Sequence, residues 1–176
     1  FDGMWDKKEA DWQLRRTYDL IHGLQPQALI LNNHHQAVKP GEDLKGFERS
    51  LPGQVNFLGQ APEADASVPM EMCQTIGRTW GYNLVDTDFK SPKEIVQLLA
   101  KAAGNDANLL LNVGPQPDGR LPAACVEILE AVGQWLAVNG EAIYGTRMGP
   151  LSPRPWGVTT AKDGKVFLHL LDWPDE

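Results

Sequence analysis

The sequence has few cysteines, no long apolar run and no excess of basic residues. Its two cysteines, Cys73 and Cys125, are too few for a disulfide framework, and their spacing matches no zinc site. Because both lie in apolar periodic stretches, we expect buried free thiols. No apolar run approaches the roughly 20 residues of a membrane-spanning helix. The net charge of −7 argues against nucleic acid or an anionic membrane surface as a partner, since either requires a basic face.

Two common motifs are absent as well. There is no Asn-x-Ser/Thr sequon, so N-glycosylation gives no information on the compartment. There is no Gly-x-Gly-x-x-Gly run, which argues against a Rossmann domain. What is present is an ordinary globular composition, 42% hydrophobic and 22% charged. A chain of this length can bury one core, or most of one and the start of a second.

Strand-like and helix-like segments alternate along most of the chain. Continuous apolar runs predict buried strands, and the predicted strands are 28–31, 70–76 and 108–113. Apolar periodicity predicts helices at 9–24, 91–104 and 122–139. The second helix opens with the capping box Ser91-Pro92-Lys93-Glu94. This alternation implies right-handed βαβ units and a parallel sheet, and therefore an α/β fold.

The chain reads as part of a longer protein. Phe1-Asp2 looks like the end of a strand whose beginning is missing, and a full TIM barrel needs roughly 250 residues. We therefore predict the C-terminal half of a (β/α)8 TIM-like barrel over residues 1–148. Residues 149–176 change to a Pro-rich pattern and then to a strand-like run, which predicts a linker and the first strand or strands of another, β-type module. Half a barrel leaves an unpaired sheet edge, so self-association of the isolated segment is expected, and a homo-oligomer remains open.

Polar side chains gather where the predicted strands end. Phe1-Asp2-Gly3-Met4-Trp5-Asp6 places a carboxylate before a glycine, with Trp5 as a flat wall suited to a sugar ring. Taken alone, this stretch is more simply interpreted as an ordinary turn formed by Asp2 and Asp6. The run Asn32-Asn33-His34-His35-Gln36 follows the predicted strand 28–31, at the position where α/β barrels carry their chemistry. His34-His35 is a poor metal pair, because adjacent strand residues point to opposite faces.

A long connection, 37–69, separates two predicted strands and carries the carboxylates Glu42, Asp43 and Glu48. Long ordered loops tend to be functional, whereas the adjacent pair Glu42-Asp43 is expected to be solvated. Trp80 and Tyr82 either contact a ligand or fill the mouth of the barrel. Other aromatic and amide side chains have simpler interpretations: Trp12 and Trp135 as packing residues within helices, and Asn112 as a backbone cap at a strand end.

Taken together, these stretches resemble the retaining α-L-fucosidases of glycoside hydrolase family 29. The resemblance covers about residues 1–148. It rests on Phe1-Asp2-Gly3, Trp80-Gly81-Tyr82-Asn83, residues 108–115 with Asp118-Gly119, and residues 140–146. It implies a (β/α) barrel catalytic domain over 1–148, followed over 149–176 by the beginning of a small antiparallel β-sandwich domain. The first strand of that domain is expected near 166–171.

The resemblance also implies site residues. Asp2 falls at the position of the family's nucleophile. For the acid/base we choose Glu48, with Glu63, Glu42 and Glu71 as rivals in that order. Trp80 resembles the aromatic residue that the family places against the fucose methyl group. His34 occupies a strand end at which the family has a polar sugar-binding residue. Trp5 is added as a substrate-binding residue, and no metal is expected.

The predicted chemistry is the removal of terminal α-L-fucose from an oligosaccharide or glycoconjugate, with retention and without a cofactor. Retaining hydrolysis needs two carboxyl groups about 5–5.5 Å apart, one ionised as nucleophile and one protonated as acid. The alternatives are a catalytically silent fucose-binding relative and a retaining glycosidase for another sugar. The substrate suggests an extracellular, periplasmic or lysosomal compartment. The 176-residue chain alone is expected to be inactive.

Overall fold

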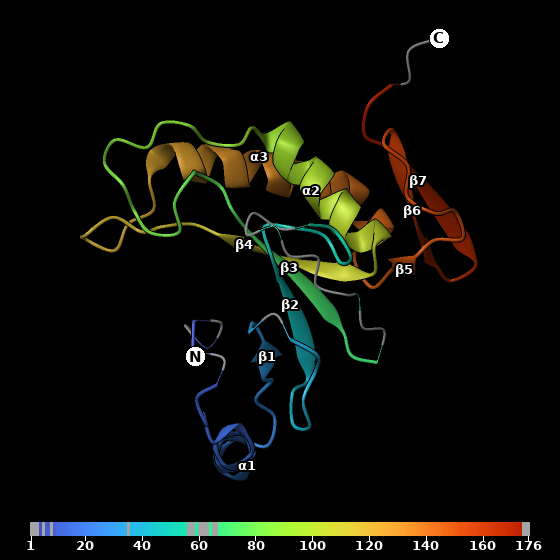
Figure 1. Cartoon of the computed structure of the whole chain (residues 1–176). Helices are drawn as coiled ribbons and strands as arrows, with labels where there is room; N and C mark the ends of the chain where they lie inside the picture. Colours follow the sequence, from blue (N-terminus) through green and yellow to red (C-terminus); the bar gives the residue numbers. More distant parts are fainter. Residues whose placement is uncertain are drawn as a thin grey trace. The chain divides into compact units, whose positions relative to one another are not determined.

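The computed structural model describes residues 4, 6, 7, 9–34, 36–55, 59, 64 and 67–173. The chain divides into two compact units, Phe1–Met72 and Cys73–Glu176 (Figure 1). The first unit contains α1 (Leu14–Leu24), β1 (Leu31–Asn32), β2 (Leu44–Glu48) and the start of β3 (Met70–Thr75). The second contains the end of β3, α2 (Pro92–Gly104), β4 (Ala107–Asn112), α3 (Ala123–Asn139), η1 (Gly140–Ala142), β5 (Arg147–Met148), β6 (Gly157–Lys162) and β7 (Lys165–Leu170). One sheet has the strand order β1-β2-β3-β4 and the other β5-β6-β7, which agrees with the predicted α/β fold.

In the first unit β1 and β2 are parallel neighbours. Leu31 lies beside Leu44 and Asn32 beside Lys45. The N–H of Lys45 donates to the carbonyl of Pro69 at 2.9 Å, immediately before β3. Lys45 is buried, and its ammonium lies 5.8 Å from the centroid of the Phe47 ring, a cation–π arrangement that helps to compensate its burial.

The strand β2 was not predicted, because residues 37–69 were interpreted as a long connection. Its sequence, Leu44-Lys45-Gly46-Phe47-Glu48, contains no β-branched residue and has a glycine at its centre. The neighbouring strand end favours the glycine, since a Cβ at Gly46 would lie 3.1 Å from the carbonyl oxygen of Asn32, a tight contact. The formation of β2 therefore depends on its close packing against β1, which a local sequence pattern does not reveal.

The helix α1 is shorter than the predicted helix 9–24. It begins at Leu14 because Gln13 adopts a left-handed backbone with φ of 51°. Trp12 therefore precedes the helix, contrary to the prediction. Tyr18 is the buried residue of α1, whereas Leu14 and Ile21, which follow the same apolar periodicity, are half-buried.

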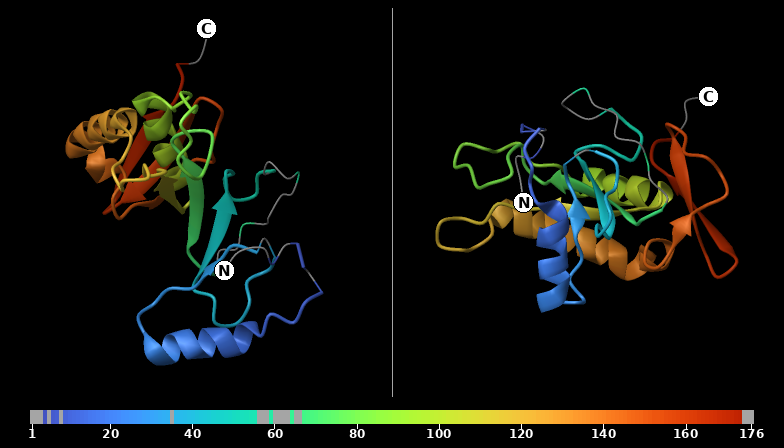
Figure 2. Two further views of the ribbon diagram at one scale, coloured as in Figure 1. Left: turned by 90° about the vertical axis from the view of Figure 1, so that its left-hand side faces the viewer. Right: turned by 60° about the horizontal axis from the view of Figure 1, so that its bottom comes forward.

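The second unit confirms the predicted helices and strands closely. The capping box at α2 is formed: the Ser91 N–H donates to Glu94 Oε2 at 2.7 Å, and the Glu94 N–H donates to Ser91 Oγ at 3.3 Å. The N–H of Ile76 donates to the carbonyl of Asn112 at 3.1 Å where β3 and β4 both end, as expected for parallel neighbours. α2 and α3 lie side by side (Figures 1 and 2). Their core cluster comprises Ile76, Ile95, Cys125 and Val132.

Both cysteines are free thiols, as predicted, with Cys125 buried and Cys73 partly buried. Burial raises the pKa of the Cys125 thiol above its ordinary value. No helix in the described part of the chain is long and apolar enough to cross a bilayer.

The C-terminal sheet is antiparallel, and it corrects one expectation. β7 matches the predicted strand, but it is the last strand of this sheet rather than the first, since β5 and β6 precede it. The hairpin between β6 and β7 turns at Asp163-Gly164, whose φ values of 50° and 76° define a type I′ turn. The sheet packs against α2 through a cluster of Ala100, Ile143, Val158 and Leu171.

Candidate active site

Several predicted site residues lie outside the described residues. These are Asp2, Trp5 and Glu63, together with His35 from the polar run after β1. Their assignments remain predictions. The structure places the other candidates, namely Glu48, Glu42, Glu71, His34 and Trp80.

Glu48 is the last residue of β2 and not, as predicted, part of an irregular loop. β1 ends at Asn32, opposite Lys45, so Glu48 stands three residues further along at the carboxyl edge of the parallel pair. This edge is where ligands bind in parallel α/β folds. Because side chains alternate along a strand, Glu48 lies on the face opposite to Lys45 and Phe47.

Glu71 shares this face with Glu48. The hydrogen bond from Lys45 N–H to the Pro69 carbonyl puts Met70 beside Lys45, and therefore Glu71 beside Gly46. Gly46 and Glu48 are two residues apart and point to the same side of the sheet. Burial raises the pKa of Glu71 above its ordinary value. A carboxyl group with that property is suited to donate a proton, so Glu71 is a stronger rival than its rank in the sequence analysis implies.

Glu42 is buried and not solvated, contrary to the expectation for the Glu42-Asp43 pair. Its Oε1 accepts from the Tyr18 hydroxyl at 2.7 Å and from His34 Nε2 at 2.8 Å. Its Oε2 accepts from Asn32 Nδ2 at 2.9 Å and from the Lys39 N–H at 2.7 Å. Four donors in one buried cluster define Glu42 as the anchor of the segment between β1 and β2.

The protonation of this cluster follows from its contacts. Burial by itself would raise the pKa of Glu42, but the hydrogen bonds from Lys39, Tyr18 and His34 outweigh it and lower the pKa below 4.5. Burial, and then the hydrogen bond to Glu42, raises the pKa of the Tyr18 hydroxyl. Glu42 is therefore an ionised structural carboxylate, which disfavours it as the proton donor of the reaction.

We expect Glu42→Gln to destabilise the protein by about 2–3 kcal/mol at pH 7, because an amide cannot accept all four hydrogen bonds. A lowered pKa stabilises the fold above pH 4.5, and this contribution is lost as the pH falls through the folded-state pKa. The difference between parent and variant should therefore shrink below pH 4.5 in urea unfolding. Asp19→Asn, which removes an exposed carboxylate paired with Arg15, is the control and should cost less than about 0.5 kcal/mol. A pH-independent difference would contradict the assignment.

His34 uses both ring nitrogens within the chain. Its Nδ1 accepts from the Gln36 N–H at 3.2 Å, so the ring hydrogen lies on Nε2 and is donated to Glu42. The side chain is almost fully buried, and its ring borders a cavity described below. This geometry favours His34 as a residue that shapes the site over one that hydrogen-bonds a sugar directly.

Trp80 lies in the second unit, in the segment that follows β3, and 38% of it is exposed. Asn112, the last residue of β4, donates from Nδ2 to the Trp80 carbonyl at 2.7 Å, which confirms its predicted role as a backbone cap. Gly114 packs against the same turn, since a Cβ there would lie 2.4 Å from the Tyr82 nitrogen. Two of the motifs behind the predicted resemblance, 80–83 and 108–115, therefore build one structural feature that presents Trp80.

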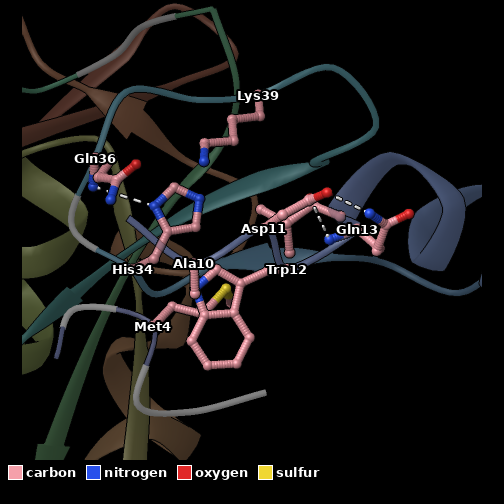
Figure 3. Close-up of a pocket in the computed structure, with 9 residues that line it drawn as sticks. Met4, Ala10, Asp11, Trp12, Gln13, His34, Gln36 and Lys39 are labelled. Atoms are coloured by element: carbon pink, nitrogen blue, oxygen red, sulfur yellow. Dashed lines mark hydrogen bonds between the residues drawn. The ribbon is translucent and has the colours of Figure 1, made fainter. Parts of the chain in front are cut away.

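A cavity of about 220 Å³ lies in the first unit (Figure 3). Its lining comprises Met4, Ala10, Asp11, Trp12, Gln13, Leu14, His34, Gln36 and Lys39. Trp12 and Lys39, which line it, are not among the predicted site residues, because no motif marks them. Within the described ranges, no three His, Cys, Asp or Glu side chains are grouped so that they could hold a metal ion.

The carboxyl edge of a parallel α/β sheet is where barrel enzymes carry their chemistry, and glycoside hydrolases of this kind use a pair of carboxylates there. The comparison with protein families narrows this class. The family described as Alpha-L-fucosidase matches residues 1–141, and the chain belongs to that family. The resemblance identified in the sequence is confirmed.

Individual relatives agree with this membership. The chain is 35% identical to human tissue alpha-L-fucosidase over 197 aligned positions, which cover 99% of this chain and 38% of that protein. Alpha-L-fucosidase isoenzyme 1 from Paenibacillus thiaminolyticus superposes with a TM-score of 0.76 at 35% identity, over 92% of this chain and 39% of that one. The Thermotoga maritima alpha-fucosidase in complex with fucose superposes with a TM-score of 0.67 at 27% identity, over 89% of this chain and 34% of that one. The chain thus spans less than half the length of these relatives.

Proposed function

We propose that the protein containing this chain is a retaining exo-α-L-fucosidase that removes terminal fucose from glycans or glycoconjugates without a cofactor. The observation that carries the proposal is the family match over residues 1–141, a range that contains Asp2, Glu48 and Trp80. The four-stranded sheet, with helix α2 connecting β3 to β4, supports the C-terminal half of a (β/α)8 barrel over 1–148. The antiparallel sheet supports a small β-domain that continues through 149–176.

In this proposal Asp2 is the nucleophile. Its carboxylate attacks the anomeric carbon of fucose and forms a fucosyl-enzyme ester, while Glu48 donates a proton to the departing oxygen. Glu48 then takes a proton from water, which attacks the ester and releases fucose with its original configuration. The position of Glu48 at the carboxyl edge of the sheet supports this role, and Glu71 on the same face is the alternative acid/base.

The remaining contacts to the sugar are assigned to aromatic side chains. Trp80 and Trp5 are proposed as apolar walls for the fucose ring and its methyl group. His34 is proposed to shape the site with its ring, while its two ring nitrogens bond Gln36 and Glu42 and hold the ring in position. The compartment proposed for such a substrate is extracellular, periplasmic or lysosomal.

The proposal is tested by hydrolysis of p-nitrophenyl α-L-fucoside by the full-length parent, that is, the whole protein that contains this chain. Proton NMR identifies the anomer of fucose released first. Release of the α-anomer supports a retaining fucosidase. Fucose binding without turnover would favour the catalytically silent relative, and faster cleavage of a galactoside would favour another sugar. The 176-residue chain tested alone should show no turnover, because it spans less than half the length of its relatives.

A further inference from the structure

Two observations relate the cavity of the first unit to the proposed reaction centre. Met4, which lines it, is only two residues from Asp2 in the sequence. His34 and Gln36, on another side, follow the carboxyl end of β1, and this is the same sheet edge that Glu48 reaches from β2. The cavity therefore lies at the sheet edge that carries Glu48, and its lining includes a residue close in sequence to Asp2.

The walls of the cavity combine an aromatic face with polar groups of opposite charge. Trp12 is 40% exposed, and its indole Nε1 donates to the Lys7 carbonyl at 3.0 Å, which fixes the ring while leaving part of its surface open. Lys39 brings an ammonium group and Asp11 a carboxylate to the same lining (Figure 3). An aromatic platform flanked by balanced donors and acceptors suits a neutral ring with many hydroxyl groups.

The size of the cavity limits what can enter it. About 220 Å³ lies below the roughly 300–1,000 Å³ of pockets for drug-sized ligands, so a single sugar ring is the appropriate occupant. Fucose itself must contact the two carboxylates and, in our proposal, Trp80. Among the described residues, the lining includes neither Glu48 nor Trp80. A ring bound in this cavity is therefore distinct from the fucose that contacts Trp80 in our proposal.

The shape of the cavity is fixed before a ligand arrives. Glu42 holds the backbone of Lys39 and the ring of His34 through hydrogen bonds, the one to His34 being fully buried. On the opposite side the Asp11 carboxylate accepts from the backbone N–H of Gln13 at 3.0 Å and from the side-chain amide Nε2 of Gln13. These two hydrogen bonds hold Gln13 in its left-handed conformation. Preorganised walls lower the entropic cost of binding and favour a role in recognition.

We infer that this cavity is the subsite for the leaving-group sugar, a neutral pyranose bonded to fucose through the oxygen that departs. Trp12 is its stacking platform, and Lys39 donates a hydrogen bond to one of its hydroxyl groups. The inference rests on the proposed fucosidase function and extends it to the sugar that precedes fucose in the glycan.

The test compares two kinds of substrate in the full-length parent. α-L-Fucosyl fluoride releases only fluoride and leaves the subsite empty, whereas fucosyl disaccharides of galactose and N-acetylglucosamine fill it. For Trp12→Ala, the kcat/KM for the best disaccharide, divided by that for the fluoride, should fall about tenfold, the effect of one lost aromatic contact. Lys39→Met should lower the same ratio, and its backbone N–H to Glu42 is retained. Trp156→Ala is the matched control, since Trp156 is 38% exposed and does not line the cavity; it should leave the ratio unchanged.

The outcomes separate this inference from the proposed function. A parallel loss on both substrates would mean that Trp12 only supports the nearby Asp2 segment, and an unchanged ratio would mean that no sugar binds there; either result overturns the subsite. A parent that cleaves neither substrate overturns the proposed function instead. In that case calorimetry decides the subsite: Trp12→Ala must weaken binding of a disaccharide more than binding of fucose, and equal effects would exclude it.

Discussion

Replacing Asp2 by asparagine should remove nearly all hydrolysis of p-nitrophenyl α-L-fucoside by the full-length parent, with kcat at least about 10³-fold lower. The amide cannot form the fucosyl-enzyme ester, so the first chemical step loses its nucleophile. Asp2→Gly should be equally inactive but should regain turnover in azide. The small anion enters the space left by the side chain, forms the carbon–nitrogen bond and displaces p-nitrophenolate. The product should be β-L-fucosyl azide, of inverted configuration, identified by NMR.

Asp6→Asn is the matched control, since Asp6 is an exposed carboxylate in the same segment that pairs with Lys7 at 3.4 Å. Its activity should remain close to that of the parent. Full activity in Asp2→Asn, or inactive Asp2→Gly that azide does not rescue, would remove Asp2 from the mechanism.

Glu48→Gln should give the second largest effect, and its size should depend on the leaving group. A p-nitrophenolate departs without much help from an acid, whereas a sugar alkoxide needs a full proton. We therefore expect kcat/KM to fall at least about 10²-fold for a fucosyl disaccharide and much less for fucosyl fluoride. The steady-state rates of both substrates, measured across pH, provide the comparison.

Glu71→Gln is the matched variant, because Glu71 shares the sheet face of Glu48. If Glu48 is the acid/base, Glu71→Gln should affect good and poor leaving groups alike. The reverse pattern, with the leaving-group dependence in Glu71→Gln and not in Glu48→Gln, would transfer the acid/base role to Glu71. The burial that raises the pKa of Glu71 makes this a serious alternative.

The elements that sequence predicted well carry strong local signals. For α2, the capping box at Ser91 and the proline at its first position mark the start, and the helix ends at Gly104 as expected. β4 is a short apolar run that was predicted within one residue of its bounds. In such segments propensity, capping and hydrophobic pattern agree, so a local interpretation is sufficient.

The missed elements depend on contacts between distant residues or on a signal that was overlooked. β2 mixes apolar and charged residues around Gly46, and its pairing with β1 is what makes it a strand. The hairpin before β7 did carry a signal, because Asp163-Gly164 is a typical type I′ turn that predicts a preceding strand. β6 was missed because the Pro-rich stretch before it obscured the start of the sheet.

In the candidate site, too, contacts between distant residues determine features that the local sequence does not reveal. Glu42 and Asp43 are adjacent carboxylates, and nothing in the sequence distinguishes the buried one from its half-exposed neighbour. The difference is made by Tyr18, located 24 residues earlier, whose hydroxyl reaches Glu42. Trp12 was likewise predicted to lie in a helix. The helix begins only after Gln13, and the sequence does not indicate that Gln13 adopts a left-handed backbone.

The contact between α2 and β6 has a consequence for how this protein can evolve. A Cβ at Gly104 would lie 2.6 Å from Cβ of Val158, so the helix end and the strand are mutually adapted. Ala100 on the helix and Leu171 after β7 belong to one cluster with Val158. A lineage that exchanged the C-terminal sheet by recombination would have to supply new partners for all of these positions at once. We therefore expect the helix and the sheet to be inherited together, with viable crossover points upstream of α2.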